Sequence, residues 1–249
     1  MHADQGRWLD AVASPASILA GCTTRFGGVS VGAYAQFNLA SHVGDDPLAV
    51  AANRQNLQVM VGATAVQWLD QVHSKQCIYA DLNSARLVPA ADAMWTDVPG
   101  LALGILTADC VPILLWSQSL PLVGAVHAGW RGLRDGVIDE LVAQMSVRSR
   151  ELYAWIGPCI GADHYEVGAD VWREFSPSDM RVHAHDADKR MLDLSAVATA
   201  RLQSAGVIHV EQTNWCSYSD PRFYSYRQAQ TSNVGSETGR MASVIMLSA

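Results

Sequence analysis

Lysine is scarce in this chain of 249 residues, in which only Lys75 and Lys189 occur. Charged residues make up 16% of the sequence, the formal net charge is −7, and no cluster of lysine and arginine is present. Because nucleic-acid binding depends on concentrated positive charge, this composition excludes nucleic acid as a main partner. The apolar share of 49% indicates instead a folded chain with a sizeable core.

Long apolar runs are also lacking. No run approaches the roughly 18 residues that suggest a membrane span, so we expect no membrane partner. The first ten residues lack the basic and apolar regions of a signal peptide. The five cysteines are widely spaced, and no C-x-x-C motif occurs. These features favour a cytoplasmic chain with reduced thiols over a secreted disulfide framework, and a monomer is the simplest expectation for its assembly.

The apolar pattern predicts more strands than helices. Short apolar or alternating segments predict strands at residues 16–24, 66–72, 76–81, 101–106, 111–116, 121–126, 152–156, 207–212 and 241–247. Helices are expected at 46–61, 134–147, 167–175 and 193–204, two of them capped by Asp46 and Asp193. The irregular order of these elements favours an α+β (mixed α/β) fold, with mixed β-sheets flanked by helices in a single compact domain over residues 1–249.

Three side chains with metal-binding or nucleophilic chemistry close apolar, strand-like segments. His73 ends W-L-D-Q-V-H, Cys110 follows L-A-L-G-I-L-T-A-D, and His127 ends P-L-V-G-A-V-H. One thiolate and two imidazoles form a zinc site with three protein ligands, and its open fourth position suits catalysis. Two other interpretations stay open. Cys110 is a nucleophile with His127 as its base, or Cys110 is a small buried residue and the histidines cap strand ends. Spacing alone favours the last interpretation, because the gaps match no local metal motif.

Two glycine-rich turns each carry an arginine. Arg25 lies in T-R-F-G-G, and Arg131 lies in A-G-W-R-G. Glycines at such turns allow an anion to approach the backbone, and arginine binds phosphate or carboxylate through two parallel hydrogen bonds. Asn38 and His42 follow the first turn in F-N-L-A-S-H. An ordinary surface turn beside a solvated arginine explains these residues about as well.

Other polar residues have plainer interpretations. Arg227 in F-Y-S-Y-R and Arg240 in G-R-M-A-S are interpreted as solvated strand ends, because the tyrosines before Arg227 alternate as in a strand. Asp109 directly precedes the candidate cysteine and is expected to orient a turn. The single H-x-H pair, His183 and His185, lies in a polar segment, which favours a solvated loop.

Together these motifs resemble the laccase-domain family, also called multicopper polyphenol oxidoreductases. Its bacterial members include the peptidoglycan editing factor and purine nucleoside phosphorylases. The resemblance spans nearly the whole chain through T-R-F-G-G-V-S, N-L-A-S-H-V-G-D-D, Q-V-H-S, A-D-A-M-W-T-D, T-A-D-C-V-P-I-L-L, A-V-H-A-G-W-R-G-L, I-G-P-C-I-G-A-D-H-Y-E-V-G, F-Y-S-Y-R and G-R-M-A-S. The pairing of A-D-C with V-H-A-G-W-R-G is its most specific part.

The resemblance implies that His73, Cys110 and His127 bind one zinc ion. It implies phosphorolysis of adenosine, inosine and S-methyl-5′-thioadenosine, with adenosine deamination as a second activity, so the expected partners are purine nucleosides and phosphate. It also implies an α/β architecture with mixed sheets. The remaining candidates lie in matching blocks and are expected to contact substrate; they are Arg25, Asn38, His42 and Arg131.

Copper fits the chain less well than zinc. A laccase needs several coppers held by many histidines at H-x-H spacings, whereas this chain has eight histidines and one such pair. The alternatives to a phosphorylase are a Cys110–His127 hydrolase acting on an amide or peptidoglycan precursor, a partner-binding chain with a structural zinc, and a copper-dependent polyphenol oxidase. The segment 228–239 is longer and less basic than is usual in the family, which weakens the expectation of substrate contacts there.

Overall fold

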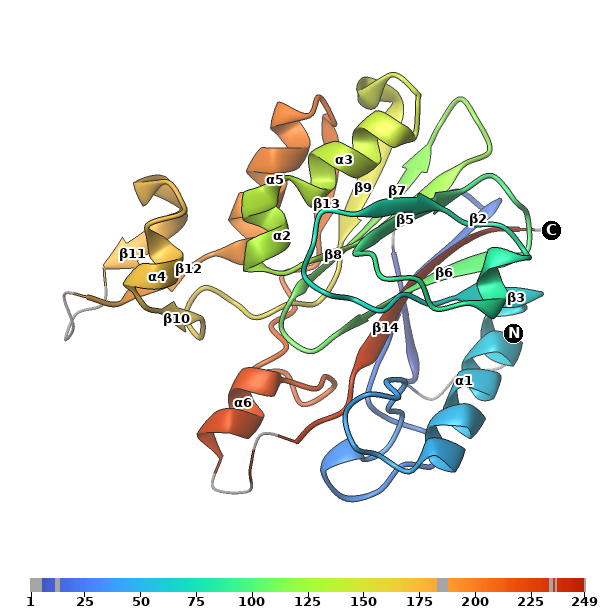
Figure 1. The fold of residues 1–249 in the computed structure, drawn as a ribbon, viewed down its shortest axis with the longest axis horizontal. Coiled ribbons are helices and arrows are strands. Elements are labelled where there is room, and N and C mark those ends of the chain that lie inside the picture. The colour runs from blue at the N-terminus through green and yellow to red at the C-terminus, as the bar shows by residue number, and fades with distance from the viewer. Residues whose placement is uncertain (1–5, 12–13, 183–187, 233–234, 236, 249) are drawn as a thin grey trace.

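Two β-sheets lie face to face in the computed structural model, which describes residues 6–11, 14–182, 188–232, 235 and 237–248 (Figure 1). The five-stranded sheet has the order β1 (Trp8–Asp10), β2 (Ile18–Thr23), β14 (Met241–Leu247), β6 (Leu101–Thr107) and β3 (Ala65–Gln67). The six-stranded sheet has the order β13 (His209–Gln212), β9 (Leu152–Ile156), β7 (Val111–Ser117), β8 (Val123–Ala128), β5 (Ala93–Thr96) and β4 (Cys77–Tyr79). Both sheets are mixed, because β3–β6, β4–β5 and β9–β13 pair in parallel and the other pairs are antiparallel.

Helices cover the outer faces of both sheets. α2 (Trp130–Asp135), α3 (Val137–Gln144) and α5 (Leu194–Ser204) pack on the six-stranded sheet, and α1 (Pro47–Val61) packs on the five-stranded one (Figure 1). The chain also forms α4 (Ala169–Trp172), α6 (Tyr226–Thr231), a small antiparallel sheet of β10 (Glu166–Val167), β12 (Arg190–Leu192) and β11 (Met180–Val182), and short 3₁₀ turns at Gly32–Tyr34, Ser84–Arg86, Ser149–Glu151 and Pro177–Asp179. The predicted mixed α/β class is confirmed.

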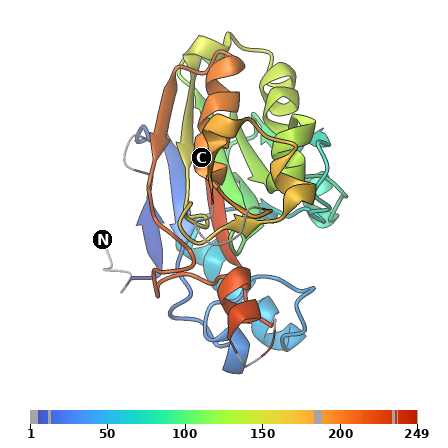
Figure 2. The ribbon, with the colours of Figure 1, turned by 90° about the vertical axis from the view of Figure 1, so that its left-hand side faces the viewer.

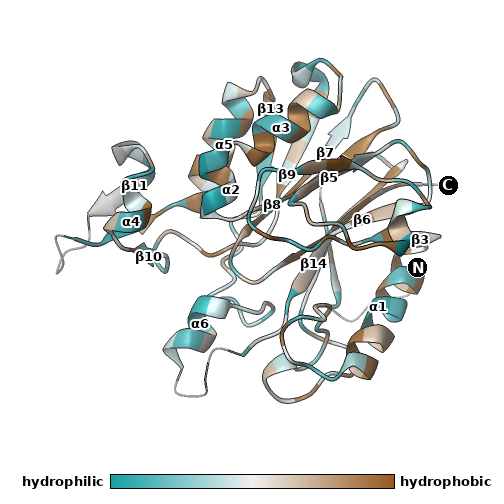
Figure 3. Cartoon of the chain, viewed as in Figure 1, coloured by the Kyte–Doolittle hydropathy of each residue, from teal (hydrophilic) through white to brown (hydrophobic). Residues whose placement is uncertain are grey.

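The central strands are buried on both faces, which explains why their sequences are unbroken apolar runs. Successive side chains of a strand point to opposite faces. Along β6, Leu103 and Ile105 pack between the sheets, while Ala102 and Leu106 pack under α1. The strands in the middle of the molecule are therefore apolar, and the outward faces of α2 and α5 are polar (Figure 3).

Two predicted caps form as expected. The Asp46 side chain accepts a hydrogen bond from the Leu48 backbone N–H (3.0 Å), Pro47 occupies the first turn, and Gly62 ends α1 in the left-handed region at φ +68°. The Asp193 side chain accepts from the Ala196 N–H (2.9 Å) and starts α5. Short polar side chains satisfy the otherwise unpaired N–H groups of a first helical turn.

Four local predictions are wrong. The helix predicted at 134–147 is interrupted at Gly136, whose φ of +88° separates α2 from α3. The helix predicted at 167–175 is reduced to the single turn α4, and the strand predicted at 66–72 ends at Gln67. The tyrosine-rich segment before Arg227 does not end a strand. Instead, the Ser225 side chain accepts from the Gln228 N–H and caps α6.

The chain crosses from one sheet to the other between β6 and β7, at residues 108–110. In both views α6 and the loop before α1 lie at the same end of the molecule (Figure 2). Segments from the two ends of the sequence therefore meet near this crossing. Among the described residues, no helix is both long and apolar enough to cross a membrane.

Candidate active site

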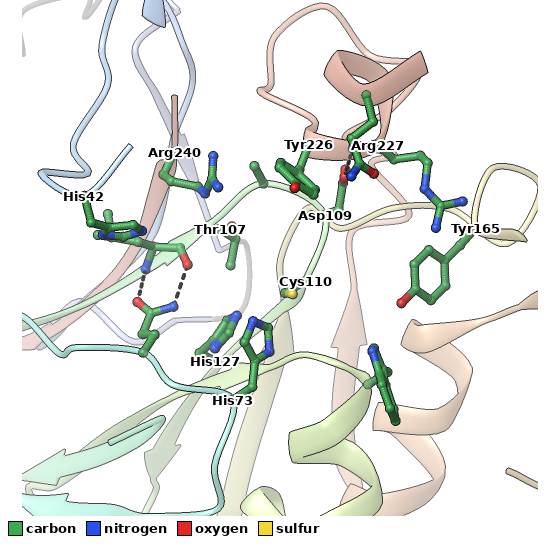
Figure 4. Close-up of a pocket in the computed structure, with 15 residues that line it drawn as sticks. His42, His73, Thr107, Asp109, Cys110, His127, Tyr165, Tyr226, Arg227 and Arg240 are labelled. Carbon is green, nitrogen blue, oxygen red and sulfur yellow. Dashed lines mark hydrogen bonds between the residues drawn. The ribbon is translucent and has the colours of Figure 1, made fainter. Parts of the chain in front are cut away.

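A cavity of about 490 Å³ opens at the crossing between the two sheets, a size typical of small-molecule sites. Its walls come from segments that are far apart in the sequence (Figure 4). They consist of His42, Gln71, His73, Leu106, Thr107, Ala108, Asp109, Cys110, His127, Trp130, Tyr165, Tyr226, Arg227, Gln230 and Arg240.

His73, Cys110 and His127 meet on one wall of this cavity. One ligand atom from each lies within 4.8 Å of the other two, and the two imidazole rings are 4.8 Å apart between centroids. His127 is 5% exposed, and the other two are half-buried. The structure thus brings together the three residues that the sequence predicts as a cluster.

Asp92 holds both histidines in place. Its carboxylate lies 2.8 Å from His127 Nδ1 and accepts hydrogen bonds from the His73 N–H (3.1 Å) and from the Ser74 N–H and hydroxyl (2.6 and 2.9 Å). Burial works to raise the pKa of Asp92, but these hydrogen bonds and the nearby imidazole hold it below its usual value. A charged Asp92 accepts the proton of His127 Nδ1, which leaves Nε2 as the ligand atom of that ring.

The absence of a side chain at Gly129 lets His73 and Cys110 approach each other closely. A Cβ at this position would lie 2.5 Å from His73 Nδ1 and 3.2 Å from Cys110 Sγ. The His73 backbone has a positive φ of 59°, which turns its ring back toward β8. Gln71 fixes the same loop to β6 through two hydrogen bonds to the Leu106 backbone, 2.7 and 2.8 Å long. The glycine that the sequence suggested for anion binding is therefore needed for the ligand cluster itself.

Among the described residues, one buried nitrogen of the cluster lacks a hydrogen-bond partner, and at another nitrogen a proton competes with any metal ion. Burial alone would lower the pKa of the His127 imidazole, but Cys110 and Asp92 raise it to about 9, so a metal ion at Nε2 would have to displace a proton. Burial, reinforced by His127, lowers the pKa of His73, and its Nδ1 atom is buried without a hydrogen-bond partner among the described residues. A cation between one thiolate and two imidazoles would satisfy this orphaned atom and neutralise the thiolate.

The structure separates the predicted substrate residues. His42 lines the cavity, whereas Arg25, Asn38 and Arg131 do not. The Arg25 guanidinium donates to the Ala35 carbonyl (3.0 Å) and lies over Tyr224, 4.7 Å from the ring centroid. Arg131 is exposed and lies 4.3 Å from the centroid of the neighbouring Trp130. Neither arginine lines the cavity, although the charge of Arg131 acts on His73 and Tyr165 in its wall.

The segment near the C-terminus supplies the cations that line the cavity. Arg227 and Arg240 both do so, and the prediction that they are solvated is wrong. Arg240 directly precedes β14 and so lies at a strand end as predicted, whereas Arg227 lies in α6. The Arg227 N–H donates to an Asp109 carboxylate oxygen (2.6 Å), and the Ser217 hydroxyl donates to the other oxygen (2.7 Å). Asp109 turns the chain with φ +102°, as expected, and also joins the cluster to α6. In the sequence, the only sign of a site at these two arginines was the tyrosine before Arg227 and the glycine before Arg240.

The predicted H-x-H pair, His183 and His185, lies outside the described residues.

Comparison with known proteins identifies the family of this chain. The sequence model of the family described as multi-copper polyphenol oxidoreductase laccase matches residues 19–248. A purine nucleoside phosphorylase of Pseudomonas aeruginosa is 40% identical over 240 residues, which cover 94% of this chain and 95% of that protein. The purine nucleoside phosphorylase YfiH of Escherichia coli is 36% identical over 238 residues, which again cover 94% of this chain and 95% of that protein.

Solved structures share the fold. A crystal structure from Neisseria meningitidis has a TM-score of 0.90 at 38% identity and covers 98% of this chain and 100% of that one. The structure of YlmD from Geobacillus stearothermophilus has a TM-score of 0.91 at 30% identity, with 100% and 98% covered. With a family match over residues 19–248 and relatives similar along nearly its whole length, this chain belongs to the multi-copper polyphenol oxidoreductase laccase family, as its motifs predicted.

Proposed function

We propose that this protein cleaves purine nucleosides by phosphorolysis, with adenosine, inosine and S-methyl-5′-thioadenosine as substrates. The observation that carries the proposal is one cavity that presents a His–Cys–His cluster, aromatic rings and two arginines to the same space. The names of the relatives, which match over nearly the full chain, support the same reaction. Adenosine deamination at this site is proposed as a second activity.

Each part of the wall has a use in this reaction. Trp130 and Tyr165 line the cavity, where a purine could contact the parts of their rings that the neighbouring arginines leave uncovered. The two arginines that line the cavity offer charge to phosphate. Phosphate held by these charges would have a raised effective concentration at the reacting carbon, which favours it over water as the nucleophile. Because these groups come from separate elements, the fold holds them in place before substrate binds.

We propose that His73, Cys110 and His127 hold one zinc ion. The donor set and the orphaned His73 Nδ1 support a metal here, and Asp92 would orient the His127 imidazole toward it while fixing the His73 backbone. When bound, zinc supplies Lewis-acid polarisation of a substrate oxygen. Copper is the weaker proposal. Among the described residues this is the one group of three ligands, and the cavity wall includes no methionine to act as an axial copper ligand.

A cysteine hydrolase is the second candidate. Cys110 and His127 interact directly, and Asp92 bonds the far side of the imidazole, which is the arrangement of a nucleophile, a base and an orienting carboxylate. Such an enzyme would act on an amide or a peptidoglycan precursor without any metal. Metal content therefore separates the two candidates.

The test is product analysis with adenosine in the presence and absence of phosphate. Phosphorolysis should give adenine and ribose 1-phosphate, and only when phosphate is present. Equal rates with and without phosphate, with free ribose as product, would replace phosphorolysis by hydrolysis. Inosine formed without phosphate would demonstrate the deaminase activity separately.

A further inference from the structure

The two cations of the cavity have different surroundings. Figure 4 shows Arg240 and His42 on one side of Cys110, and Arg227 and Tyr165 on the other. Arg227 donates to the Glu166 carbonyl (2.9 Å), and its guanidinium lies 5.1 Å from the centroid of the Tyr165 ring. This arginine is therefore held at the Tyr165 side of the cavity through Nη1, whereas the guanidinium of Arg240 lies 5.7 Å from the centroid of the Tyr226 ring.

Arg240 is held so that part of its guanidinium stays free. Its Nη1 donates to the Thr238 and Gly239 carbonyls (2.9 and 3.0 Å). Its backbone N–H donates to the buried Asn38 amide oxygen (3.0 Å), which also accepts from the Ala40 N–H. Among the described residues, no carboxylate forms an ion pair with Arg240, and nothing accepts a hydrogen bond from its Nε or Nη2. Two donors of its fork are thus available.

This free cation is half-buried and faces the ligand cluster. Burial lowers the pKa of Arg240, and the largest opposing influences come from Cys110 and Asp109. The neighbouring His42 has its pKa lowered by burial and by Arg240, so it stays uncharged at neutral pH. An uncharged imidazole thus lies beside a partly desolvated guanidinium that forms no direct ion pair among the described residues, while Cys110 and Asp109 act on its charge from further away. An anion in the cavity could pair with the free donors of this guanidinium.

We propose that Arg240 is the phosphate-binding residue of this cavity, with His42 as a neutral hydrogen-bonding neighbour. This inference rests on the proposed phosphorolysis, and it assigns phosphate to the side of the cavity that carries Arg240. In this arrangement the purine lies toward Tyr165 and Trp130. The ribose lies between the phosphate and the purine, beside Cys110. Arginine fits phosphate through two parallel N–H···O bonds, which also orients the attacking oxygen.

The reaction balances with phosphate as the only co-reactant. A phosphate oxygen forms a bond to ribose C1′ while the bond from C1′ to the purine nitrogen breaks. The electron pair of that bond leaves with the purine, and the purine takes up the proton that HPO₄²⁻ gives up. The products are ribose 1-phosphate and the free base. A cation that fixes phosphate near C1′ raises its effective concentration at the reacting carbon.

The test compares Arg240→Gln and Arg240→Lys with the control Arg25→Gln, which removes an arginine outside the cavity. In Arg240→Gln, the KM for phosphate should rise by at least about tenfold, while the KM for adenosine changes much less. Lysine should restore only part of the loss, because it lacks the fork. Titration calorimetry with inorganic phosphate should detect binding to the wild type and to Arg25→Gln, but not to Arg240→Gln.

A second measurement uses the unaltered protein. Phosphate, but not chloride at equal ionic strength, should slow the modification of Arg240 by phenylglyoxal more than that of Arg227, as followed by peptide mass spectrometry. Equal protection of both, or an unchanged phosphate KM in Arg240→Gln, would overturn the assignment. A wild type that cleaves adenosine without phosphate would contradict the proposed function, while the calorimetric and protection results would still decide whether Arg240 binds phosphate.

Discussion

Asp92 is a fully buried carboxylate that contacts both histidines of the cluster from behind. Replacing it by Asn keeps the shape but substitutes an NH₂ group for an oxygen that faces donors. We expect Asp92→Asn to weaken zinc binding by about 10–100-fold, as is usual when a hydrogen-bonded partner of a metal-ligating histidine is lost. Competition with a fluorescent zinc chelator measures the affinity. The control is Asp97→Asn, an exposed position on the same segment, which should bind zinc like the wild type; equal affinities in all three proteins would contradict the role of Asp92.

A substitution at Gly129 would show whether close packing around His73 is needed for zinc binding and for stability. Its φ of −73° suits alanine, so a substitution acts only through the added methyl group, which would lie 2.5 Å from His73 Nδ1. Gly129→Ala should displace that ring, reduce zinc retention and lower stability by about 1–3 kcal/mol. The readouts are zinc per chain after dialysis and urea denaturation. Gly132→Ala is the matched control from the same motif, because a Cβ there would first meet Val137 at 3.2 Å. Normal zinc retention in Gly129→Ala would refute the steric argument.

The three residues of the cluster were predictable from the sequence, but the residues that support them were not. His73, Cys110 and His127 have chemically distinctive side chains at the ends of apolar segments, so their types and places were informative. Asp92 and Arg240 have common side chains, and their importance arises only from contacts across 35 residues in one case and 202 in the other. Arg25 and Arg131 had the more suggestive glycine-rich neighbours, yet neither of them lines the cavity.

At the level of elements, periodicity alone misjudged where α2 and α3 divide. The apolar spacing continues through Gly136, but its backbone lies in the left-handed region. Gly136→Ala should lower the free energy of unfolding by about 1–2 kcal/mol through backbone strain. Gly136→Asn should cost less, because asparagine tolerates this region better. Chemical denaturation of the three proteins provides the measurement. An alanine variant as stable as the wild type would mean that the helices can rejoin without strain.

Elements buried on both faces were predictable, and short or exposed ones were not. β6 and β7 have continuous apolar sequences, so their bounds were close to the observed ones. β5 has only four residues and was missed, and α6 begins at a tyrosine that suggested a strand. The structure of α6 depends on its Ser225 cap and on the Arg227 N–H reaching Asp109, and this long-range contact has no local signature.

For the whole molecule, the position of the cluster at the edge of a large core decides what the proposed metal would contribute to stability. Three layers of apolar side chains hold the two sheets and their helices together, and none of them needs the ligands to be filled. A site with three protein ligands and an open position usually serves chemistry, whereas a closed site of four ligands usually holds a fold. The fourth ligand of a structural site is missing among the described residues.

Zinc removal should therefore abolish activity without unfolding the protein. Chelator-treated protein should keep its far-ultraviolet circular dichroism, and its melting temperature should fall by only the few degrees expected from the loss of a ligand that binds the native state alone. Added zinc should restore one ion per chain and full turnover. Cys110→Ser is the matched variant: it should remain folded, bind zinc poorly and stay inactive after zinc is added. If chelation or Cys110→Ser unfolds the chain, the metal is structural and the proposed chemistry at this cluster is wrong. If the metal-free protein remains active, the cysteine–histidine hydrolase becomes the better explanation, because that mechanism needs only the thiolate, His127 and Asp92.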